Sequence, residues 1–565
     1  MNSSELLKTK YNALMDDIGN NDHEQELQFL IPGLLKNFMD NHISVAIYCN
    51  GYHTERILGD YVSELKDIYF IIDNNEEKTS NTGYCVIPER SIKDTNIDGV
   101  IISSYRYRDE IKESLFRNYP NIDYLDIYEE GEKRGIHSES AYYSHNPYEV
   151  YMRINAYMRR IDENKEDVYT LRLLLTDLLR IKDFRLSLST SLRIFECTAE
   201  KTDFQIYKKI KDLKELFWKQ ARSIDERNVL LFCADGLRSV DFSEDDGLTR
   251  VYNEVKKRAV IYSNAYSYST STYESLLPSF SERDNAGKES EIPSDECRFI
   301  KMALDEGRKV YFYCDSYKII EDDRINYTKC SQTITQKIWD FVLDAKSVTN
   351  GLFYIHELYE SHYSFANPYT TTNLVARGTT IFFDFLPQNG GHLQTDYTLQ
   401  HSDSMRYLDD TLVEFFKNVN CQILFFADHG NIVLDKNTTL EKLGDTCFTA
   451  SEDCIRIPLA IISPKVAPRI DDMIMSLWDI NNIVISLMQN KEFIPERREY
   501  IRIGRNRIYN PEFHEIYKMA GKEKYLLAFT GTVSNKGIKH LYFEDGTEEM
   551  YDITLGDDRR IANSK

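Results

Sequence analysis

Long hydrophobic runs are missing from this sequence. No stretch of the 565 residues approaches the roughly 18 consecutive apolar residues that a membrane-spanning helix needs. The opening stretch, MNSSELLKTKYNALMDDIG, also lacks the apolar core of a signal peptide. We therefore expect a cytoplasmic protein without a transmembrane segment.

Paired cysteines are missing as well. The ten cysteines are scattered singly and form no CxxC pair. Several of them, such as Cys49, Cys233 and Cys421, lie in or beside apolar runs. This pattern excludes a disulfide framework as the basis of the fold and indicates buried free thiols.

Positive charge is in short supply. Lys and Arg number 69 against 91 Asp and Glu, which gives a formal net charge of -22. Because like charges repel, nucleic acid or an anionic membrane surface is disfavoured as the main partner. The hydrophobic share of 42% and the charged share of 28% are ordinary for a globular protein, and the length predicts two or three domains.

The first half of the chain divides into three predicted parts. Residues 1–40 have apolar positions at helical spacing and predict a helical lead-in. Residues 41–145 alternate four strand-like runs with helical segments, which predicts a small Rossmann-like parallel sheet. Residues 146–225 contain long mixtures of charged and apolar residues, without Pro or Gly between Tyr148 and Ile224, and predict a helical connector. The four runs are ISVAIY, DIYFII, DGVIIS and IDYLDIY.

The turn after the first of these strands is a weak candidate for a nucleotide site. Of a glycine fingerprint only Gly51 is left, so a close approach of a pyrophosphate to the backbone is not secured. Asp73 follows the second strand, where such folds often place a ribose-binding acid, but it also begins an ordinary turn. The region resembles the Rossmann-like domains of sugar-nucleotide and capsule-biosynthesis proteins. A bound nucleotide or nucleotide sugar and a docking or scaffold role both stay open.

Residues 226–565 return to strands, and several strands end in polar residues. The run CQILFFADHGN ends in Asp428 and His429, NVLLFCADG ends in Asp235, and His392 lies in a predicted loop beyond TTIFFDF. Burying an acid or an imidazole without a partner costs several kcal/mol, roughly, and a metal ion would satisfy both. The alternative for each motif is a solvated turn. The tail predicts a small antiparallel subdomain.

These strand ends predict a shared site. In an open parallel sheet the ligand lies at the carboxyl ends of the strands, which would bring Asp235, Asp428, His429 and His392 to one edge. Two carboxylates and an imidazole suit Zn or Mn. Asp315 closes the strand-like run RKVYFYCDSY, whereas Asp396 and His401 are polar residues near His392 without a clear role.

A hydroxyl nucleophile is predicted in the segment SNAYSYSTSTYESLLPSF, where a helix should begin near Thr272. The exposed amides and positive dipole end of a helix favour both an alkoxide and an incoming phosphate. The alternative is a Ser/Thr-rich loop that only caps the helix.

The order of these motifs resembles the alkaline phosphatase superfamily, in its sulfatase-like branch. The segments NVLLFCADGLR, TSTYES, ADHG, RIPLAIISP and EEMYDI are similar to those of phosphoethanolamine and phosphoglycerol transferases across roughly residues 226–560. The resemblance implies a sulfatase-like α/β fold and a metal held by Asp235, Thr272, Asp428 and His429. It also implies Thr272 as the nucleophile and His392 as a contact to substrate or to a second metal.

The sequence also departs from this family. TYESL lacks the Cys, Pro and Arg of a sulfatase site, which disfavours sulfate ester hydrolysis. The stretch NIVLDKNTTLEKLGDTCFTASED lacks the second histidine that the transferases usually carry after Asp-His-Gly, and their membrane helices are missing. A non-catalytic binding or scaffold protein with the same fold is therefore the rival hypothesis.

We expect a metal-dependent phosphotransferase that works through a phospho-threonine intermediate at Thr272. The resemblance implies a phosphorylated lipid or small-molecule donor, phosphoethanolamine or phosphoglycerol as the transferred group, and a surface or capsular glycan precursor as acceptor. A phosphodiesterase or phosphatase of the same superfamily is the alternative within the enzymes.

Overall fold

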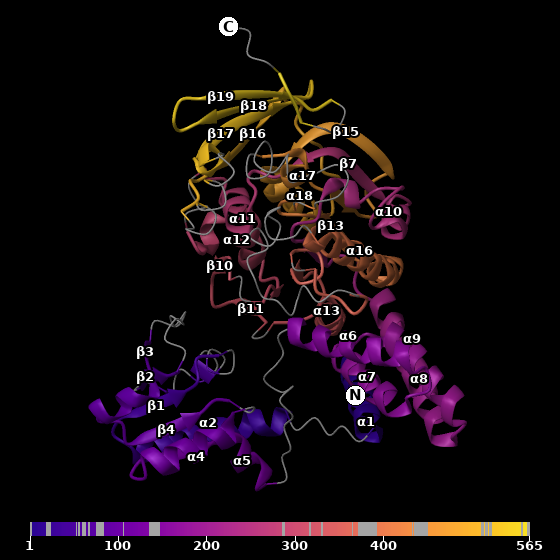
Figure 1. Ribbon diagram of the computed structural model, residues 1–565. Coiled ribbons are helices and arrows are strands. Elements are labelled where there is room, and N and C mark those ends of the chain that lie inside the picture. Colours follow the sequence, from indigo (N-terminus) through magenta and orange to yellow (C-terminus); the bar gives the residue numbers. More distant parts are fainter. Residues whose placement is uncertain are drawn as a thin grey trace. The chain divides into compact units, whose positions relative to one another are not determined.

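The protein is seen in a computed structural model as two compact units, residues 15–150 and residues 1–14 together with 151–565 (Figure 1). Each unit is described by itself. The structure describes residues 3–18, 24–51, 54, 57–58, 61, 64–65, 68–74, 84–104, 107–134, 147–284, 289–315, 318–328, 331–363, 365–370, 392–431, 433, 450–509, 514, 518, 523–554 and 558–561.

The unit of residues 15–150 is built on a five-stranded parallel sheet in the order β3-β2-β1-β4-β5. Its apolar strands pack against the accompanying helices in two clusters, one on Ile47 and Ile101 and one on Ala46 and Ile102, because successive residues of a strand point to opposite faces. The elements are α2 (Glu24–Asn41), β1 (Val45–Tyr48), β2 (Ile68–Ile72), β3 (Cys85–Ile87), β4 (Gly99–Ile102), α4 (Arg108–Asn118), β5 (Asp123–Asp126) and α5 (Ile127–Glu132).

The larger unit begins with helices. α1 (Ser3–Asp17) supplies its first residues, and four helices then follow in sequence from residue 147 onward. Asp167 and Asp183 cap two of these helices by accepting hydrogen bonds from the backbone amides of Thr170 and Leu186. The four helices are α6 (Pro147–Glu163), α7 (Val168–Arg180), α8 (Phe184–Thr198) and α9 (Lys201–Arg222).

An eight-stranded sheet forms the centre of this unit, in the order β11-β9-β12-β6-β13-β14-β7-β15. Its neighbouring strands pair in parallel except at β14, which runs antiparallel to both β13 and β7. The strands are β6 (Val229–Ala234), β7 (Ala259–Tyr266), β9 (Val310–Tyr313), β11 (Ile325–Tyr327), β12 (Leu352–Glu357), β13 (Gln422–Phe426), β14 (Leu459–Ile462) and β15 (Arg469–Ser476). β8 (Ile292–Pro293) and β10 (Ile320–Glu321) pair separately.

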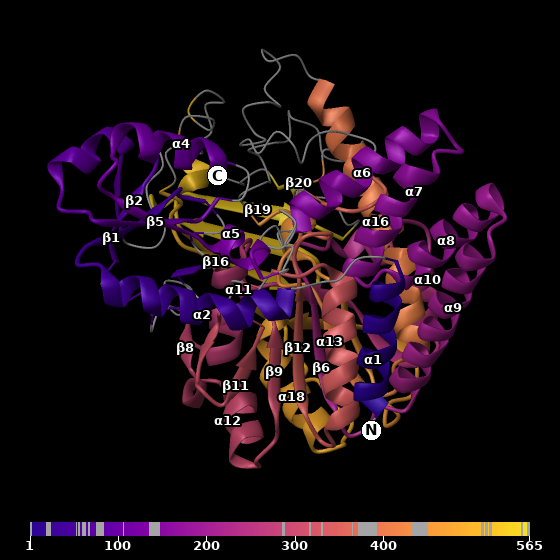
Figure 2. The same cartoon turned by 90° about the horizontal axis from the view of Figure 1, so that it is seen from below.

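Helices cover both faces of this sheet. Phe353 of β12 contacts Phe341 of α13, while the next residue, Tyr354, contacts Phe280 of α11. Adjacent residues of a strand point to opposite faces, so α13 and α11 lie on different sides. Figure 2 shows α13 running along the strands β12 and β6. The helices are α10 (Thr249–Val255), α11 (Thr272–Ser281), α12 (Arg298–Asp305), α13 (Ile334–Ser347), α16 (His392–Asn418), α17 (Glu452–Ile455) and α18 (Ile480–Met488).

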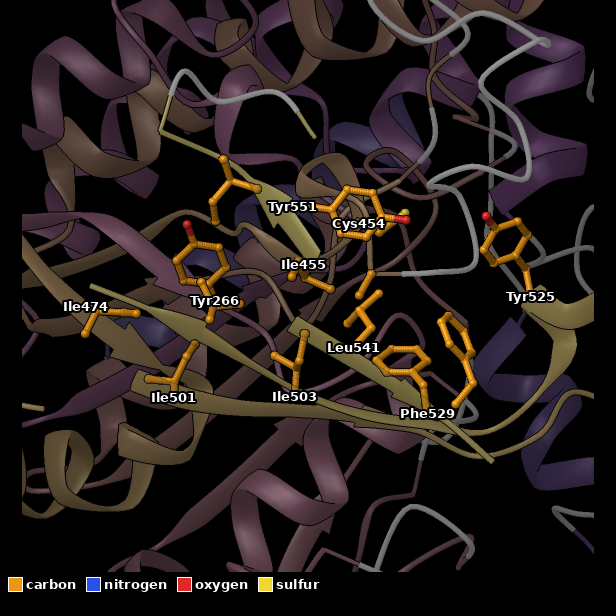
Figure 3. Packing of buried hydrophobic residues seen from close by; sticks show 14 of the residues in the cluster. Tyr266, Cys454, Ile455, Ile474, Ile501, Ile503, Tyr525, Phe529, Leu541 and Tyr551 are labelled. Atoms are coloured by element: carbon orange, nitrogen blue, oxygen red, sulfur yellow. The ribbon is translucent and has the colours of Figure 1, made fainter. Parts of the chain in front are cut away.

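The C-terminal part forms a separate five-stranded antiparallel sheet, β16-β17-β18-β19-β20. Its inner face packs on the end of the large sheet through a cluster that includes Ile501, Phe529, Leu541 and Tyr266 (Figure 3). The strands are β16 (Tyr500–Arg505), β17 (Phe529–Ser534), β18 (Ile538–Phe543), β19 (Glu548–Asp552) and β20 (Arg559–Arg560).

The predicted α/β class, with a small parallel sheet before a larger sheet, is confirmed. The prediction of four strands in the first sheet is wrong by one, because the short strand β3 has too few residues to show a pattern. The predicted strand TTIFFDF lies outside the described residues. Among the helices that the structure describes, none is both long and apolar enough to cross a membrane.

Candidate functional site

Three neighbouring strands in the middle of the large sheet end at one edge with polar residues. β12, β6 and β13 are parallel, and their carboxyl ends carry His356, Asp235 and Asp428. β7 runs in the same direction and leads through a short loop into α11, whose first residue is Thr272. The sheet therefore brings together side chains that lie far apart in the sequence.

The carboxylate of Asp428 is fixed by backbone amides. Its Oδ1 accepts hydrogen bonds from the amides of Gly236, at 3.1 Å, and His429, at 2.9 Å. Gly236 has φ +70°, and a Cβ at this position would lie 2.2 Å from the side chain of Asn431, so only glycine fits this turn. The second oxygen, Oδ2, is buried and has no hydrogen-bond partner among the described residues.

The carboxylate of Asp235 is likewise held through one of its two oxygens, here by side chains. Its Oδ2 accepts hydrogen bonds from Nε2 of His356, at 2.7 Å, and from Oγ1 of Thr272, at 3.2 Å. Its Oδ1 is buried, and within the described part of the chain no hydrogen bond reaches it. Asp235 and Asp428 are both 0% exposed, so each carboxylate has one oxygen that is closed off from bulk solvent and receives no hydrogen bond from the described residues.

His429 faces both of these oxygens. Its Nδ1 donates a hydrogen bond to the carbonyl of Gly430 at 2.8 Å, which leaves a lone pair on Nε2. Nε2 lies 3.5 Å from Asp235 Oδ1, 3.5 Å from Asp428 Oδ2 and 3.5 Å from Thr272 Oγ1. Ligand bonds of about 2.0–2.1 Å in a tetrahedral zinc site place neighbouring ligand atoms about 3.4 Å apart. The three distances from His429 Nε2 are close to this value.

His362 is a further imidazole at this site that the sequence did not predict. Its Nε2 lies 3.9 Å from Asp235 Oδ1, and its Nδ1 donates to the carbonyl of Tyr363 at 2.9 Å, so its Nε2 also carries a lone pair. The side chain is 32% exposed, in contrast to the buried residues around it. Asp235, His362 and His429 form one group of side chains that could hold a metal ion.

His356 was missed as well, and it plays a different part. The carboxylate of Asp235 can only accept a hydrogen bond, so Nε2 of His356 carries the proton and donates it to Asp235. Nδ1 of His356 then accepts a hydrogen bond from the hydroxyl of Tyr354 at 3.0 Å. His356 thus orients the carboxylate. The apolar strand LFYIHE, whose last two residues are His356 and Glu357, was a detectable signal, and His362 follows in the adjoining turn.

The charges at the site influence each other. Burial alone would raise the pKa of Asp235, but the imidazoles of His362, His356 and His429 hold that pKa below its usual value. Burial and the charge of Asp235 raise the pKa of Asp428. Burial opposes charge on His429, but the two carboxylates outweigh it and raise the pKa of the imidazole. The site concentrates negative charge that a cation would neutralise.

The other predicted residues of this unit lie elsewhere or are not described. His392 begins α16, so its prediction as a loop residue is wrong, and its side chain, like that of Asp396, lies outside the described residues. Gly390 and Gly391 directly precede His392 and made a loop look more plausible than the start of a helix. His401 pairs with Asp241 at 3.3 Å. Asp315 forms a buried ion pair with Lys337.

In the smaller unit, Gly51 and Asp73 lie at the ends of neighbouring strands β1 and β2. Oδ2 of Asp73 accepts a hydrogen bond from the amide of Asn50 at 2.7 Å, so this carboxylate braces the first turn. A Cβ on Gly51 would meet nothing within 4 Å, so no close packing requires glycine here. Neither observation points to a ribose or a pyrophosphate.

The fold and the site describe an α/β protein with a buried carboxylate and imidazole cluster at the edge of a mixed sheet. Residues 41–122 match the family model described as C2185-like, N-terminal. No curated protein matches the chain.

Several solved structures resemble the chain over its larger part. A protein in the alkaline phosphatase superfamily from Vibrio parahaemolyticus has 12% identity and a TM-score of 0.41, with 62% of this chain and 91% of that chain covered. The phosphonate monoester hydrolase of Agrobacterium radiobacter has 11% identity and a TM-score of 0.38, with 58% and 89% covered. The C-terminal periplasmic domain of EcEptC from Escherichia coli, in complex with Zn, has 13% identity and a TM-score of 0.34, with 48% and 84% covered.

Proposed function

We propose that the larger unit is a metal-dependent phosphotransferase whose nucleophile is the hydroxyl of Thr272. One observation carries this proposal. Two buried carboxylate oxygens, from Asp235 and Asp428, receive no hydrogen bond from the described residues and lie 3.5 Å from the same nitrogen of His429, beside the hydroxyl of a residue that begins a helix. A structure leaves such oxygens buried only at a large cost unless a cation binds there.

Asp235, Asp428, His429 and Thr272 would hold the ion, for which the oxygen and nitrogen ligands favour Zn or Mn. When bound, the ion would supply positive charge that lowers the pKa of the threonine hydroxyl and stabilises the charge on phosphoryl oxygens. Thr272 Oγ1 donates its hydrogen to Asp235 Oδ2. The lone pairs of the threonine oxygen therefore point away from the carboxylate. The first amides of α11 add donors for phosphoryl oxygens.

The reaction proceeds in two balanced steps. Oγ1 of Thr272 forms a bond to phosphorus while the bond from phosphorus to the donor's alcohol oxygen breaks, and the hydroxyl proton leaves with that alcohol. An acceptor hydroxyl, or water, then attacks phosphorus and releases Thr272 with its proton restored. The half-exposed His362 borders the site and is suited to contact the phosphoryl group.

The finer assignment is supported by the sequence motifs. We propose a phosphorylated lipid or small-molecule donor, phosphoethanolamine or phosphoglycerol as the moved group, and a glycan precursor as the acceptor. For the unit of residues 15–150 a docking role has better support than a nucleotide site, because the carboxylate of Asp73 is already used within the turn.

The test compares wild type with Thr272→Val and Thr272→Ser after zinc loading. The substrate is bis(p-nitrophenyl) phosphate, and acid-quenched samples are searched by mass spectrometry for a phosphoryl adduct on the peptide that contains Thr272. We expect wild type to release nitrophenol and form the adduct, Thr272→Ser to keep part of both, and Thr272→Val to lose them by about 1000-fold or more. If all three bind zinc and none turns over, or all turn over equally, the non-catalytic scaffold is favoured.

A further inference from the structure

A buried ion pair lies beside the proposed metal site, within the larger unit. Lys337, in the first turn of α13, pairs with Asp315, which follows β9, and both side chains are 1% exposed. The Nζ of Lys337 also donates a hydrogen bond to the backbone carbonyl of His356 at 2.6 Å. The pair therefore contacts the main chain of the residue whose imidazole donates to Asp235.

The strand pairing explains why this carbonyl needs a donor. β9 pairs in parallel with β12 and ends one residue before it would reach His356. The amide of Leu352 donates to the carbonyl of Lys309 on the β9 side at 2.9 Å, so every second residue of β12, including His356, turns its backbone groups toward β9. If β9 continued, the amide of Asp315 would donate to the carbonyl of His356.

Asp315 ends the strand and also holds the group that replaces its amide. The backbone of Asp315 has φ +53°, a left-handed conformation that takes the chain out of the sheet. Its carboxylate accepts a hydrogen bond from the amide of Gln332 at 2.8 Å and another from the ammonium group of Lys337. The ammonium group thus takes the place of a strand amide at the carbonyl of His356.

A gain in stability does not explain this pair well. Taking both charges out of water is unfavourable, and apolar residues of similar volume often make a fold equally stable. A positive charge in the first turn of α13 also opposes the dipole of that helix. The hydrogen bond to the carbonyl of His356 gives the pair a more specific role.

His356 is held from both faces of the sheet. Successive residues of a strand point to opposite faces, and Phe353 contacts α13 while Tyr354 contacts α11. The imidazole of His356 therefore lies on the α11 side, where Nε2 donates to Oδ2 of Asp235 at 2.7 Å. Lys337 reaches the backbone of His356 from the α13 side. A shift of this strand end would move the imidazole relative to the carboxylate.

We propose that Lys337 and Asp315 are positioning residues, which hold the end of β12 where the imidazole of His356 meets the carboxylate of Asp235. The proposal rests on the proposed function, because Asp235 is an expected ligand of the metal ion. It extends the support of the site to a buried pair on the other face of the sheet. Loss of the pair should weaken metal binding without removing a ligand.

The test replaces both charged residues together, so that neither charge stays buried alone. Asp315→Asn keeps a residue that tolerates the left-handed backbone, and Lys337→Met keeps a long side chain without a donor. In the metal-free protein, proton NMR follows the downfield signal of the Nε2 hydrogen of His356, which is the signal absent from His356→Gln. We expect the double variant to lose or shift this signal and to bind zinc about tenfold more weakly than wild type.

Two further variants serve as controls. Asp315→Asn with Lys337→Gln keeps an amide donor for the carbonyl and should retain more of the signal and of the zinc affinity. Lys214→Met with Glu414→Gln removes a pair that joins α9 to α16 at 2.8 Å, and it should change neither quantity. In a His356→Ala background, removal of the Lys337 pair should cause no further loss of zinc affinity, because the pair acts through His356.

The proposal is overturned if the double variant, folded by thermal melting, keeps the wild-type signal and zinc affinity, or if it loses as much affinity in the His356→Ala background. It is also overturned if wild type shows no downfield signal. Lys337→Leu replaces Lys337→Met if the latter does not fold. A wild type that shows the signal but binds no zinc would refute the proposed function, and the NMR comparison would still decide whether the pair positions His356.

Discussion

In both α/β sheets of this protein, parallel strands end in acidic residues, but these acids are used differently. In the smaller unit, Asp73 accepts from a backbone amide, and Asp126 caps α5 through the amides of Tyr128 and Glu129. The other oxygen of Asp126 is also buried without a hydrogen bond from the described residues, but the ammonium group of Lys112 lies 3.1 Å from it and neutralises its charge. In the larger unit, Asp235 and Asp428 each leave one buried oxygen without a hydrogen bond from any described residue.

This difference is why we propose a metal site in the larger sheet and a structural role for the acids of the smaller one. A carboxylate that accepts from turn amides or a neighbouring lysine stabilises its own loop, and its position at a strand end needs no other explanation. In contrast, a buried carboxylate oxygen that lacks a partner and faces an imidazole lone pair does need a further explanation, and a bound cation supplies it. The comparison therefore predicts that mutations in the two sheets have effects of different kinds.

The largest effect is expected from Asp428→Asn. The change removes one charge and one ligand oxygen, so zinc affinity should fall more than 100-fold, beyond the 10–100-fold typical of a residue that only orients a ligand. Because two like charges are buried together, the metal-free variant should be more stable than metal-free wild type, by about 1–2 kcal/mol. Competition with a chromogenic chelator and thermal melting measure the two quantities.

Asp73→Asn is the control for this variant, since it removes a charge from the corresponding position of the other sheet. Its zinc affinity should equal that of wild type. Equal affinity in Asp428→Asn as well would show that the cluster in the larger sheet does not bind the ion.

Zinc binding itself should affect only one of the two sheets. Zinc at 100 times its Kd stabilises the folded state by about 2.7 kcal/mol, which corresponds to about 100-fold slower opening exchange. Hydrogen exchange should slow in residues 229–238, 268–276 and 426–431, and stay unchanged in β1 and β2. Slower exchange in the smaller sheet alone, or in neither, would contradict the assignment of the site.

A smaller effect is expected from the residues that orient Asp235. His356→Ala removes the donor to the carboxylate and should weaken zinc binding 10–100-fold, whereas His356→Gln keeps an amide donor and should restore part of the affinity. Tyr354→Phe removes only the hydroxyl that fixes the imidazole and should cost about tenfold or less. If His356→Gln binds zinc no better than His356→Ala, the residue fills space instead of orienting the ligand.

The sequence predicted the strand ends with Asp235 and Asp428 because a polar residue after an apolar run is visible in one dimension. It also predicted the helix that begins at Thr272. It could not predict which carboxylates keep one oxygen without a hydrogen bond. The amides that donate to Asp73 and to one oxygen of Asp428 belong to turns that form only in the folded chain. His356 and His362 were missed for a related reason, because their role depends on β12 lying next to β6.

The smallest effect is expected from Asp73→Ala in the smaller sheet. Losing the hydrogen bond to the amide of Asn50 should destabilise the smaller unit by about 1 kcal/mol, while Asp73→Asn, which keeps an acceptor oxygen, should cost less. Hydrogen exchange of β1 and β2 measures the change.

The nucleotide hypothesis gives the opposite expectation, namely that UDP-glucose slows exchange of these strands in wild type and not in Asp73→Ala. A structural acid should show the loss of protection in Asp73→Ala and no response to UDP-glucose in either protein, because its carboxylate is already bound to the turn it stabilises.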